Sequence, residues 1–244
     1  MEMTDDVIDA VRPRKNRLSR PPVANVDMAL VVVTLREPRM SFLEVDRRLV
    51  LVHLAKIRPA VVLGKTDLLK DGEISSFLSL YRAAGYEAVG VSARSGEGLG
   101  DLRRLLRGQL AVLSGPSGVG KSSVLSALTG QRLETGSLAG GDRGRQTTKH
   151  VELLPVGGGF VADTPGFAAA DFPEMRRIDL QQAFPDILAH RPGCRFADCL
   201  HLSEPDCAVK DAVASESIRP ERYASYRAFL EEVREPWSRS PRPS

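Results

Sequence analysis

A glycine-rich segment, Gly115-Pro-Ser-Gly-Val-Gly-Lys-Ser122, constrains this chain more than any other feature, because it matches the pattern G-x-x-x-x-G-K-[ST]. It follows an apolar run at 109–113 with the look of a strand and opens an expected helix, KSSVLSALTG. Glycines let successive backbone amides face an anion, and the helix N-terminus adds its positive dipole end. The sequence therefore predicts a nucleotide phosphate loop, in which Lys121 reaches the β- and γ-phosphates and Ser122 ligates magnesium. The expected contacts are Gly115, Pro116, Ser117, Gly118, Val119, Gly120, Lys121, Ser122 and Ser123.

Two upstream segments bear on the choice between GTP and ATP, which the phosphate loop alone leaves open. Gly64-Lys65-Thr66-Asp67 ends an expected strand at 60–63, and Ser92-Ala93-Arg94 ends another at 87–91. They resemble the N-K-x-D and S-A-K elements with which GTPases read guanine. A carboxylate accepts hydrogen bonds from both the ring N–H and the amino group of guanine, which adenine lacks. We therefore predict guanine recognition by Gly64, Lys65, Thr66, Asp67, Ser92 and Ala93.

Two downstream segments have the look of switch elements. Asp163-Thr-Pro-Gly166 closes an expected strand at 160–162 and matches D-x-x-G. Its Asp is expected to hold magnesium through water, and the amide of its Gly to meet the γ-phosphate. Gly144-Arg-Gln-Thr-Thr148 has the composition of a first switch loop, or of an ordinary polar surface loop, and offers Thr147 or Thr148 to the magnesium. The predicted catalytic set is Lys121, Ser122, Thr148, Asp163 and Gly166, with Ser122, Thr148 and Asp163 around magnesium.

The hydrophobic pattern predicts an α/β fold with a parallel-rich sheet. Expected strands at 27–35, 60–63, 87–91 and 109–113 alternate with expected helices at 43–57, 73–84 and 99–107, and residues 151–162 read as a hairpin. Helices are expected near 179–190, 208–216 and 220–234. The base elements precede the phosphate loop, which indicates a circularly permuted GTPase. Such an order is tolerable because binding loops depend on where strands lie in the sheet.

Every cysteine of the chain lies in one cluster, Cys194-x4-Cys199-x-His201-x5-Cys207. Three thiolates and an imidazole suit tetrahedral zinc, and a closed set of protein ligands indicates a structural site. The cluster argues against a disulfide framework.

Composition excludes little else. The hydrophobic fraction is 42%, and no apolar run approaches the length of about 18 residues that a membrane helix needs. With no apolar leader in view, we expect a cytoplasmic protein. We also expect a monomer. The net charge of +3 is too small to imply nucleic acid, but a basic cluster at the start suits phosphate contacts or a solvated tail equally well. It consists of Arg12, Arg14, Lys15, Arg17 and Arg20.

Taken together, the chain resembles the ribosome small-subunit-dependent GTPase A family, which are circularly permuted GTPases of small-ribosomal-subunit biogenesis. The resemblance runs from about residue 12 to residue 233 and rests on RPRKNRLSRPPVANVD, the permuted motif order, GRQTT, GGGFVADTPGF and the cysteine cluster. It implies GTP and GDP as ligands, Mg²⁺, one structural Zn²⁺, and the small ribosomal subunit with its rRNA as partner. It also implies slow hydrolysis that the subunit stimulates.

Three positions depart from that family. Gly64 stands where the family has Asn. The loss of the Asn side chain is expected to weaken guanine binding by about 1–3 kcal/mol. Gln146 replaces the usual His. The family opens with an oligonucleotide-binding β-barrel, and the short N-terminal segment here is expected to be only a remnant of it.

The predicted domains are a basic segment at 1–25, a circularly permuted GTPase domain at 26–175, a helical zinc-binding domain at 176–235 and a loose tail at 236–244. Two other interpretations stay open. One is another P-loop phosphotransferase such as a guanylate kinase. The other is a zinc-containing RNA-binding protein whose nucleotide site has decayed around Gly64.

Overall fold

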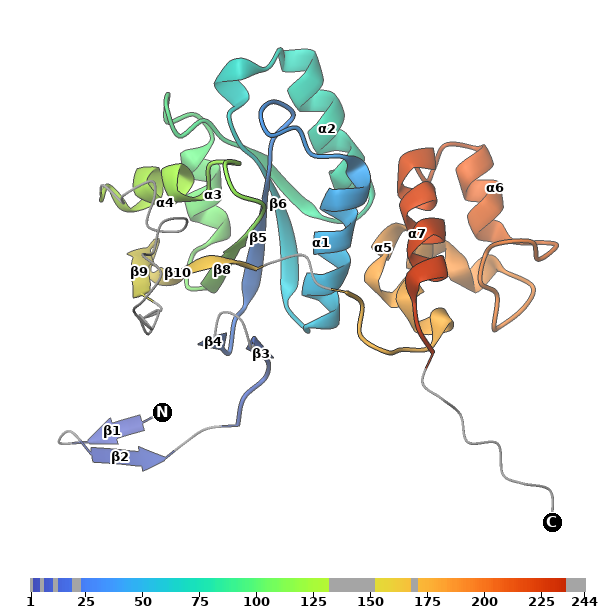
Figure 1. The fold of residues 1–244 in the computed structure, drawn as a ribbon, viewed down its shortest axis with the longest axis horizontal. Coiled ribbons are helices and arrows are strands. Elements are labelled where there is room, and N and C mark those ends of the chain that lie inside the picture. Colours follow the sequence, from blue (N-terminus) through green and yellow to red (C-terminus); the bar gives the residue numbers. More distant parts are fainter. Residues whose placement is uncertain are drawn as a thin grey trace, which may run out of the picture.

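The structure, a computed structural model, describes residues 2–4, 7–10, 13–18, 23–131, 152–167 and 171–235. One sheet of six strands, in the order β7-β6-β5-β8-β10-β9, forms its centre (Figure 1). Neighbouring strands pair in parallel except β9, which runs antiparallel to β10. The parallel-rich sheet with a hairpin that the sequence predicts is thus confirmed. Its strands are β5 (Met28–Val33), β6 (Arg58–Leu63), β7 (Glu87–Gly90), β8 (Leu110–Ser114), β9 (Glu152–Val156) and β10 (Gly159–Phe167).

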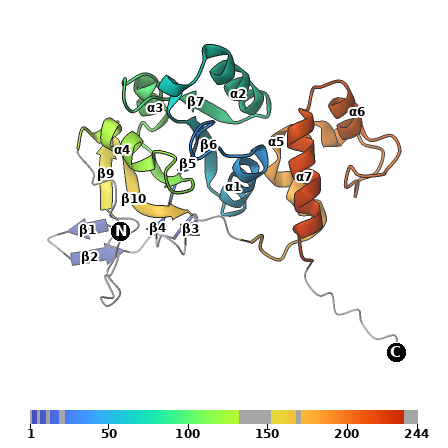
Figure 2. The same cartoon turned by 45° about the horizontal axis from the view of Figure 1, so that its top comes forward.

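Helices cover both faces of this sheet (Figure 2). Helices α1 (Phe42–Leu54) and α2 (Asp71–Ala83) lie on one face, and α3 (Leu99–Leu105) and α4 (Lys121–Thr129) lie on the other. The central strand β5 is buried along its whole length, which explains why its sequence, MALVVV, is continuously apolar. A capping box begins α1: the Ser41 side chain accepts from the Glu44 amide, and the Glu44 carboxylate accepts from the Ser41 amide.

The parallel strands bring three predicted loops to one edge of the sheet. Gly64 to Asp67 follow β6, with Thr66–Leu68 forming the 3₁₀ helix η1, and Ser92 to Arg94 follow β7. The glycine-rich segment joins β8 to α4. Strand β10 differs from the expectation. It continues to Phe167, so Asp163 to Gly166 lie within a strand whose register against β8 shifts between Ala162 and Phe167.

The residues after 175 form a separate helical module with its own hydrophobic cluster. It comprises η2 (Arg177–Ala183), α5 (Pro185–His190), η3 (Arg191–Gly193), α6 (Ala208–Ala214) and α7 (Pro220–Glu232). Helix α1 lies between the sheet and this module, and its Val50 belongs to the module's cluster (Figure 1).

One predicted helix of that module, at 179–190, is wrong as a single element. It is a 3₁₀ helix followed by a separate α-helix, divided at the extended residue Phe184. Pro185 causes the break, because a proline disfavours helical backbone in the residue before it and has no N–H to continue the ladder.

Two short strand pairs lie within the described part of the first 25 residues. They are β1 (Glu2–Thr4) paired with β2 (Val7–Ala10), and β3 (Arg17–Leu18) paired with β4 (Val23–Ala24). Leu18 of β3 and Val23 of β4 are buried in the main core, so this part of the segment packs against the sheet domain. The β1–β2 hairpin stands apart from the sheet in Figure 1. The predicted first switch at 144–148 and the predicted tail at 236–244 lie outside the described residues.

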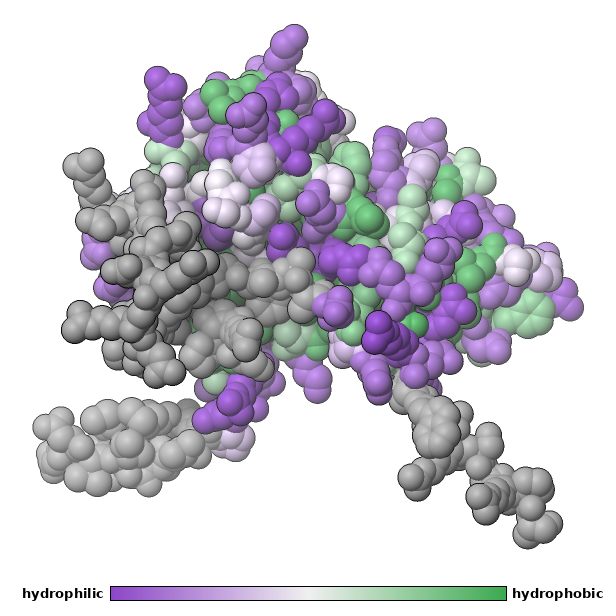
Figure 3. All heavy atoms as spheres, in the orientation of Figure 1, coloured by the Kyte–Doolittle hydropathy of each residue, from purple (hydrophilic) through white to green (hydrophobic). Residues whose placement is uncertain are grey.

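On the surface, hydrophobic side chains occur in small patches among hydrophilic ones on the face that Figure 3 shows. Among the helices that the structure describes, none is long and apolar enough to cross a membrane.

Candidate nucleotide-binding site and metal centre

The glycine-rich segment has the strand–loop–helix geometry that phosphate binding requires. At Gly115 φ is +150°, and an added Cβ would lie 2.5 Å from the Val32 carbonyl oxygen, so only glycine fits there. Gly120, with φ +101°, forms the N-cap of α4. The loop therefore ends at a helix N-terminus, where backbone amides are available to an anion.

Lys121 is the first residue of α4, directly after this loop, and is 9% exposed. Its Nζ donates to the carbonyl oxygens of Gly115, at 2.9 Å, and Pro116, at 2.7 Å. Burial and the charge of Arg48 lower the pKa of the ammonium. In the described part of the chain no carboxylate forms an ion pair with it. A buried cation whose ammonium donates to carbonyl oxygens suits an anionic ligand such as phosphate.

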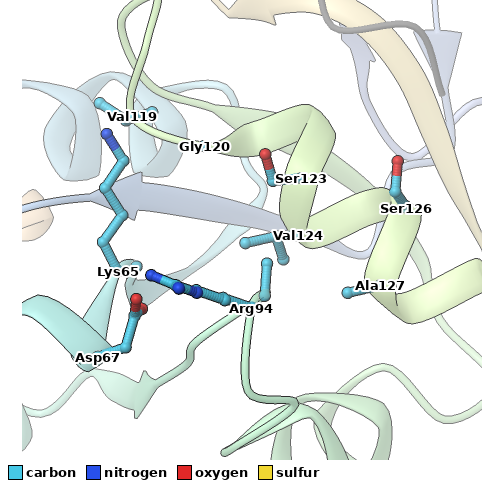
Figure 4. Close-up of a pocket in the computed structure, with 11 residues that line it drawn as sticks. Lys65, Asp67, Arg94, Val119, Gly120, Ser123, Val124, Ser126 and Ala127 are labelled. Carbon is cyan, nitrogen blue, oxygen red and sulfur yellow. The ribbon is translucent and has the colours of Figure 1, made fainter. Parts of the chain in front are cut away.

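A pocket of about 480 Å³ joins the phosphate loop to the two predicted base elements (Figure 4). Seven predicted contact residues line it, namely Gly64, Lys65, Asp67, Ala93, Val119, Gly120 and Ser123. Thr66 and Ser92 are buried and do not line the pocket. Nor do six predicted contacts at the phosphate loop, namely Gly115, Pro116, Ser117, Gly118, Lys121 and Ser122. The volume fits a ligand of nucleotide size.

Asp67 and Lys65 are held in place by bonds between loops. Ser92 donates from Oγ to Asp67 Oδ1 at 2.8 Å, so a buried hydroxyl fixes the carboxylate proposed to read the base. Lys65, with φ +57°, donates from Nζ to the carbonyl oxygens of Gly118, at 2.9 Å, and Glu37, at 2.6 Å. The lysine thus connects the base element to the phosphate loop, and Ser92 connects the two base elements.

Four pocket residues received no role from the sequence: Arg94, Val124, Ser126 and Ala127. Arg94 extends from the loop after β7 across the pocket toward Lys65 and Asp67 (Figure 4). Its place as the third residue of S-A-R was a usable signal. The other three lie on α4, at positions that helical spacing places on the face beginning at Ser123.

The predicted magnesium ligands are only partly visible. Ser122 is in the first turn of α4, directly after Lys121. The backbone of Asp163 to Gly166 lies in β10, next to β8, from which the phosphate loop emerges. Thr148 lies outside the described residues. These roles therefore stay predictions.

Cys194, Cys199, His201 and Cys207 converge in the helical module, with their ligand atoms within 4.8 Å of one another. The Sγ–Sγ distances are 3.9 Å for Cys194–Cys207 and 3.7 Å for Cys199–Cys207. His201 Nδ1 lies 3.5 Å from Cys194 Sγ and 3.4 Å from Cys207 Sγ. A tetrahedral zinc, with bonds of about 2.3 Å to sulfur and 2.0–2.1 Å to nitrogen, separates two sulfurs by about 3.8 Å and a sulfur from a nitrogen by about 3.6 Å. The residues fit one zinc ion.

Burial favours the uncharged forms of Cys199 and His201 in this cluster. Burial raises the pKa of Cys199 to about 12 and lowers the pKa of His201. A neutral imidazole is a ligand as it stands, whereas the thiol must release its proton when a cation binds. No described pair of these cysteines is disulfide-bonded.

Comparison with known proteins identifies the family. Residues 11–173 match the family described as RsgA GTPase. The chain belongs to the RsgA GTPase family. Proteins named small ribosomal subunit biogenesis GTPase RsgA match from Caldanaerobacter subterraneus subsp. tengcongensis, 42% identical over 92% of this chain and 77% of the relative, and Geobacillus kaustophilus, 44% identical over 95% and 81%.

Solved structures agree with the sequence comparison. A crystal structure of YloQ, described as a circularly permuted GTPase, matches with a TM-score of 0.77 at 35% identity, over 92% of this chain and 74% of that one. YjeQ from Thermotoga maritima matches with a TM-score of 0.77 at 34% identity, over 92% and 77%. The predicted circularly permuted fold and the predicted family are thus confirmed.

The structure leaves room for a side chain at Gly64, the position where the RsgA GTPase family has Asn. A Cβ added at Gly64 would lie 3.4 Å from the Val119 carbonyl oxygen and 3.5 Å from that of Val33, both ordinary contacts. An Asn at this position therefore fits, and its amide can donate to the phosphate loop. Gly64→Asn is expected to tighten GTP binding by about 1–3 kcal/mol, measured by calorimetric titration with GTP and ATP.

Gly72 is the matched control for that variant, because nothing lies within 4 Å of a Cβ added there. Gly72→Asn is expected to leave the affinity for GTP unchanged. Weaker GTP binding by Gly64→Asn would show that the pocket is built around the glycine.

Proposed function

We propose that this chain is a cytoplasmic GTP hydrolase that assists late maturation of the small ribosomal subunit and contacts its rRNA. The pocket that joins Asp67 to the phosphate loop carries the proposal for GTP. The names of the relatives, small ribosomal subunit biogenesis GTPase, support the subunit as partner. The proposed division is a GTPase domain at 26–175, a zinc-binding module at 176–235 and an N-terminal barrel remnant.

The proposed chemistry assigns each residue a task at the nucleotide. Lys121 neutralises charge on the β- and γ-phosphates, and the amide of Gly166 meets the γ-phosphate. Ser122, Asp163 and Thr148 hold magnesium, which when bound neutralises the charge that develops on the phosphate oxygens. Cys194, Cys199, His201 and Cys207 hold one structural zinc.

The isolated chain is proposed to hydrolyse GTP slowly. Many GTPases orient the attacking water with a Gln just after the D-x-x-G glycine. Here that position is Phe167, followed by Ala168, Ala169 and Ala170, and none of these side chains can hold a water by hydrogen bonding. Charge stabilisation remains but water positioning is missing, so a partner must supply it.

A contact downstream of the switch offers a route for that partner. Phe172 packs edge-on against Phe229 of α7, with ring centroids 5.1 Å apart. The guanidinium of Arg47, on α1, lies 4.9 Å from the centroid of each ring and pairs with Glu232 of α7. Docking of the helical module on a subunit would act on the end of the switch segment through Phe172.

The test is GTP hydrolysis with and without purified small subunits. The wild-type chain is expected to be slow alone and faster with subunits, and Lys121→Ala should lose about 10²–10³-fold in both conditions. Thr148→Ala should abolish the stimulation and Thr147→Ala should preserve it. Undiminished stimulation in Thr148→Ala would remove the first switch from the mechanism, and full activity without subunits would refute the scheme.

A chain that binds RNA but no GTP would instead support the RNA-binding interpretation.

A further inference from the structure

A buried glutamine touches the proposed zinc site from outside its ligand set. Gln181, on η2, is fully buried, and its Oε1 lies 3.0 Å from Nε2 of His201, which is also fully buried. No motif in the sequence marks this residue, and a long stretch of chain that includes α5 and η3 separates it from the ligand.

The orientation of the Gln181 amide is fixed by its other contact. Its Nε2 donates to the Ile178 carbonyl oxygen at 2.7 Å. A carbonyl oxygen only accepts, so the amide nitrogen must face Ile178 and the amide oxygen must face His201. The oxygen in turn only accepts, so the His201 Nε2 must carry a proton and donate it.

That proton decides which ring nitrogen is free for a metal. With Nε2 protonated, a neutral imidazole keeps its lone pair on Nδ1. Nδ1 is the nitrogen that lies 3.5 Å from Cys194 Sγ and 3.4 Å from Cys207 Sγ. The geometry of the sulfur atoms and the tautomer set by Gln181 therefore select the same nitrogen.

The backbone around the ligand is braced separately. The Glu204 carboxylate accepts from the amides of Leu200 and Leu202, each at 2.7 Å, and Tyr223 donates from its hydroxyl to the His201 carbonyl oxygen. These bonds hold the main chain, whereas Gln181 is placed against the ring itself.

We propose that Gln181 is a positioning residue for zinc, which holds His201 in the Nε2–H tautomer with Nδ1 aimed at the metal. The proposal rests on the zinc site assigned above to the chain. Groups of this kind, which hydrogen-bond the far nitrogen of a histidine ligand, contribute about 10- to 100-fold to metal affinity.

The experiment measures zinc affinity on the full chain by competition with a chromophoric chelator, and the visible spectrum of the Co²⁺-substituted protein. Gln181→Leu removes the acceptor and is expected to weaken zinc binding about 10- to 100-fold and to shift the Co²⁺ bands. Gln181→Glu keeps an acceptor at the ring nitrogen and should stay within a few-fold of the wild type. Gln182→Leu is the matched control, since the neighbouring glutamine is exposed and its loss should change neither readout.

A role in packing alone predicts the opposite order, because leucine suits an apolar core and a buried carboxylate does not. Equal zinc affinity in Gln181→Leu and wild type, or loss of zinc in Gln181→Glu alone, would overturn the proposal. Nitrogen NMR of the zinc-bound protein that showed Nε2 as the ligand atom would also overturn it. Failure of the zinc site itself has a different signature: the wild-type chain would bind no zinc, and Cys199→Ser would change nothing. GTP affinity, measured on every variant, reports whether the GTPase domain stays folded.

Discussion

Replacing Asp67 by Asn is expected to cost at least about 1.5–3 kcal/mol of GTP binding free energy, the contribution of one hydrogen bond to a charged acceptor, because Asn can accept from only one of the two guanine donors. The carboxylate lines the pocket and is held by Ser92 Oγ at 2.8 Å, so it is oriented before ligand arrives. An amide offers one donor and one acceptor in its place, which suits the 2-oxo group of xanthine better than the amino group of guanine. The ratio of GTP to xanthosine triphosphate affinity should therefore fall steeply, as measured by competition titration.

Asp71→Asn is the control, because this exposed carboxylate is at the start of α2 and outside the pocket. Ser92→Ala should give a smaller loss of GTP affinity than Asp67→Asn, since it frees the carboxylate without removing it. If Asp67→Asn leaves the ratio of the two affinities unchanged, the base is read elsewhere in the pocket, and Arg94 is the first residue to examine.

The parts of the site that could be predicted from the sequence are those that local rules decide. The carboxyl ends of parallel strands share an edge, so finding the strands at 60–63, 87–91 and 109–113 was enough to bring Asp67, Ala93 and Lys121 together. The metal site could also be predicted from the sequence. Its four ligands lie close together in the chain, and thiolates with an imidazole are ligands that zinc prefers.

The parts that the sequence did not predict depend on packing between distant segments. Which face of α4 lines the pocket, the bond from Lys65 to Glu37, and the contact of Gln181 with His201 all require the tertiary arrangement. The break in the helix at 179–190 is different, because it follows from the local effect of Pro185, which disfavours helical backbone at Phe184.

The largest effect on stability is expected at Arg222, which joins the helical module to the sheet domain. This α7 residue is 1% exposed and pairs with Asp46 of α1 and Asp186 of α5. Its Nε lies 3.0 Å from Asp186 Oδ2, and its Nη2 lies 3.2 Å from the Tyr86 hydroxyl. The guanidinium carbon also lies 4.7 Å from the Phe184 ring centroid. The guanidinium and the two carboxylates are thus buried together, and each charge is compensated by its partners.

Removing the cation leaves two buried carboxylates without their partner. Breaking such a pair typically costs about 3–5 kcal/mol, most of it from the uncompensated charge that remains. We therefore expect Arg222→Leu to lower the free energy of unfolding by about that amount in urea titration. Arg227→Leu on the exposed face of the same helix should change it by less than about 0.5 kcal/mol.

A rescue experiment separates charge from lost packing. Burial raises the pKa of Asp46 even beside Arg222. The positive charge of the guanidinium is the main interaction that favours the ionised form of this carboxylate. In an Arg222→Leu background, adding Asp46→Asn and Asp186→Asn removes the stranded charges and should recover a large part of the lost stability. If the double replacement makes Arg222→Leu worse, the guanidinium acts through its packing on Tyr86 and Phe184. In that case packing of the guanidinium on the aromatic rings stabilises the contact between the two domains, and the ion pairs make no net contribution to stability.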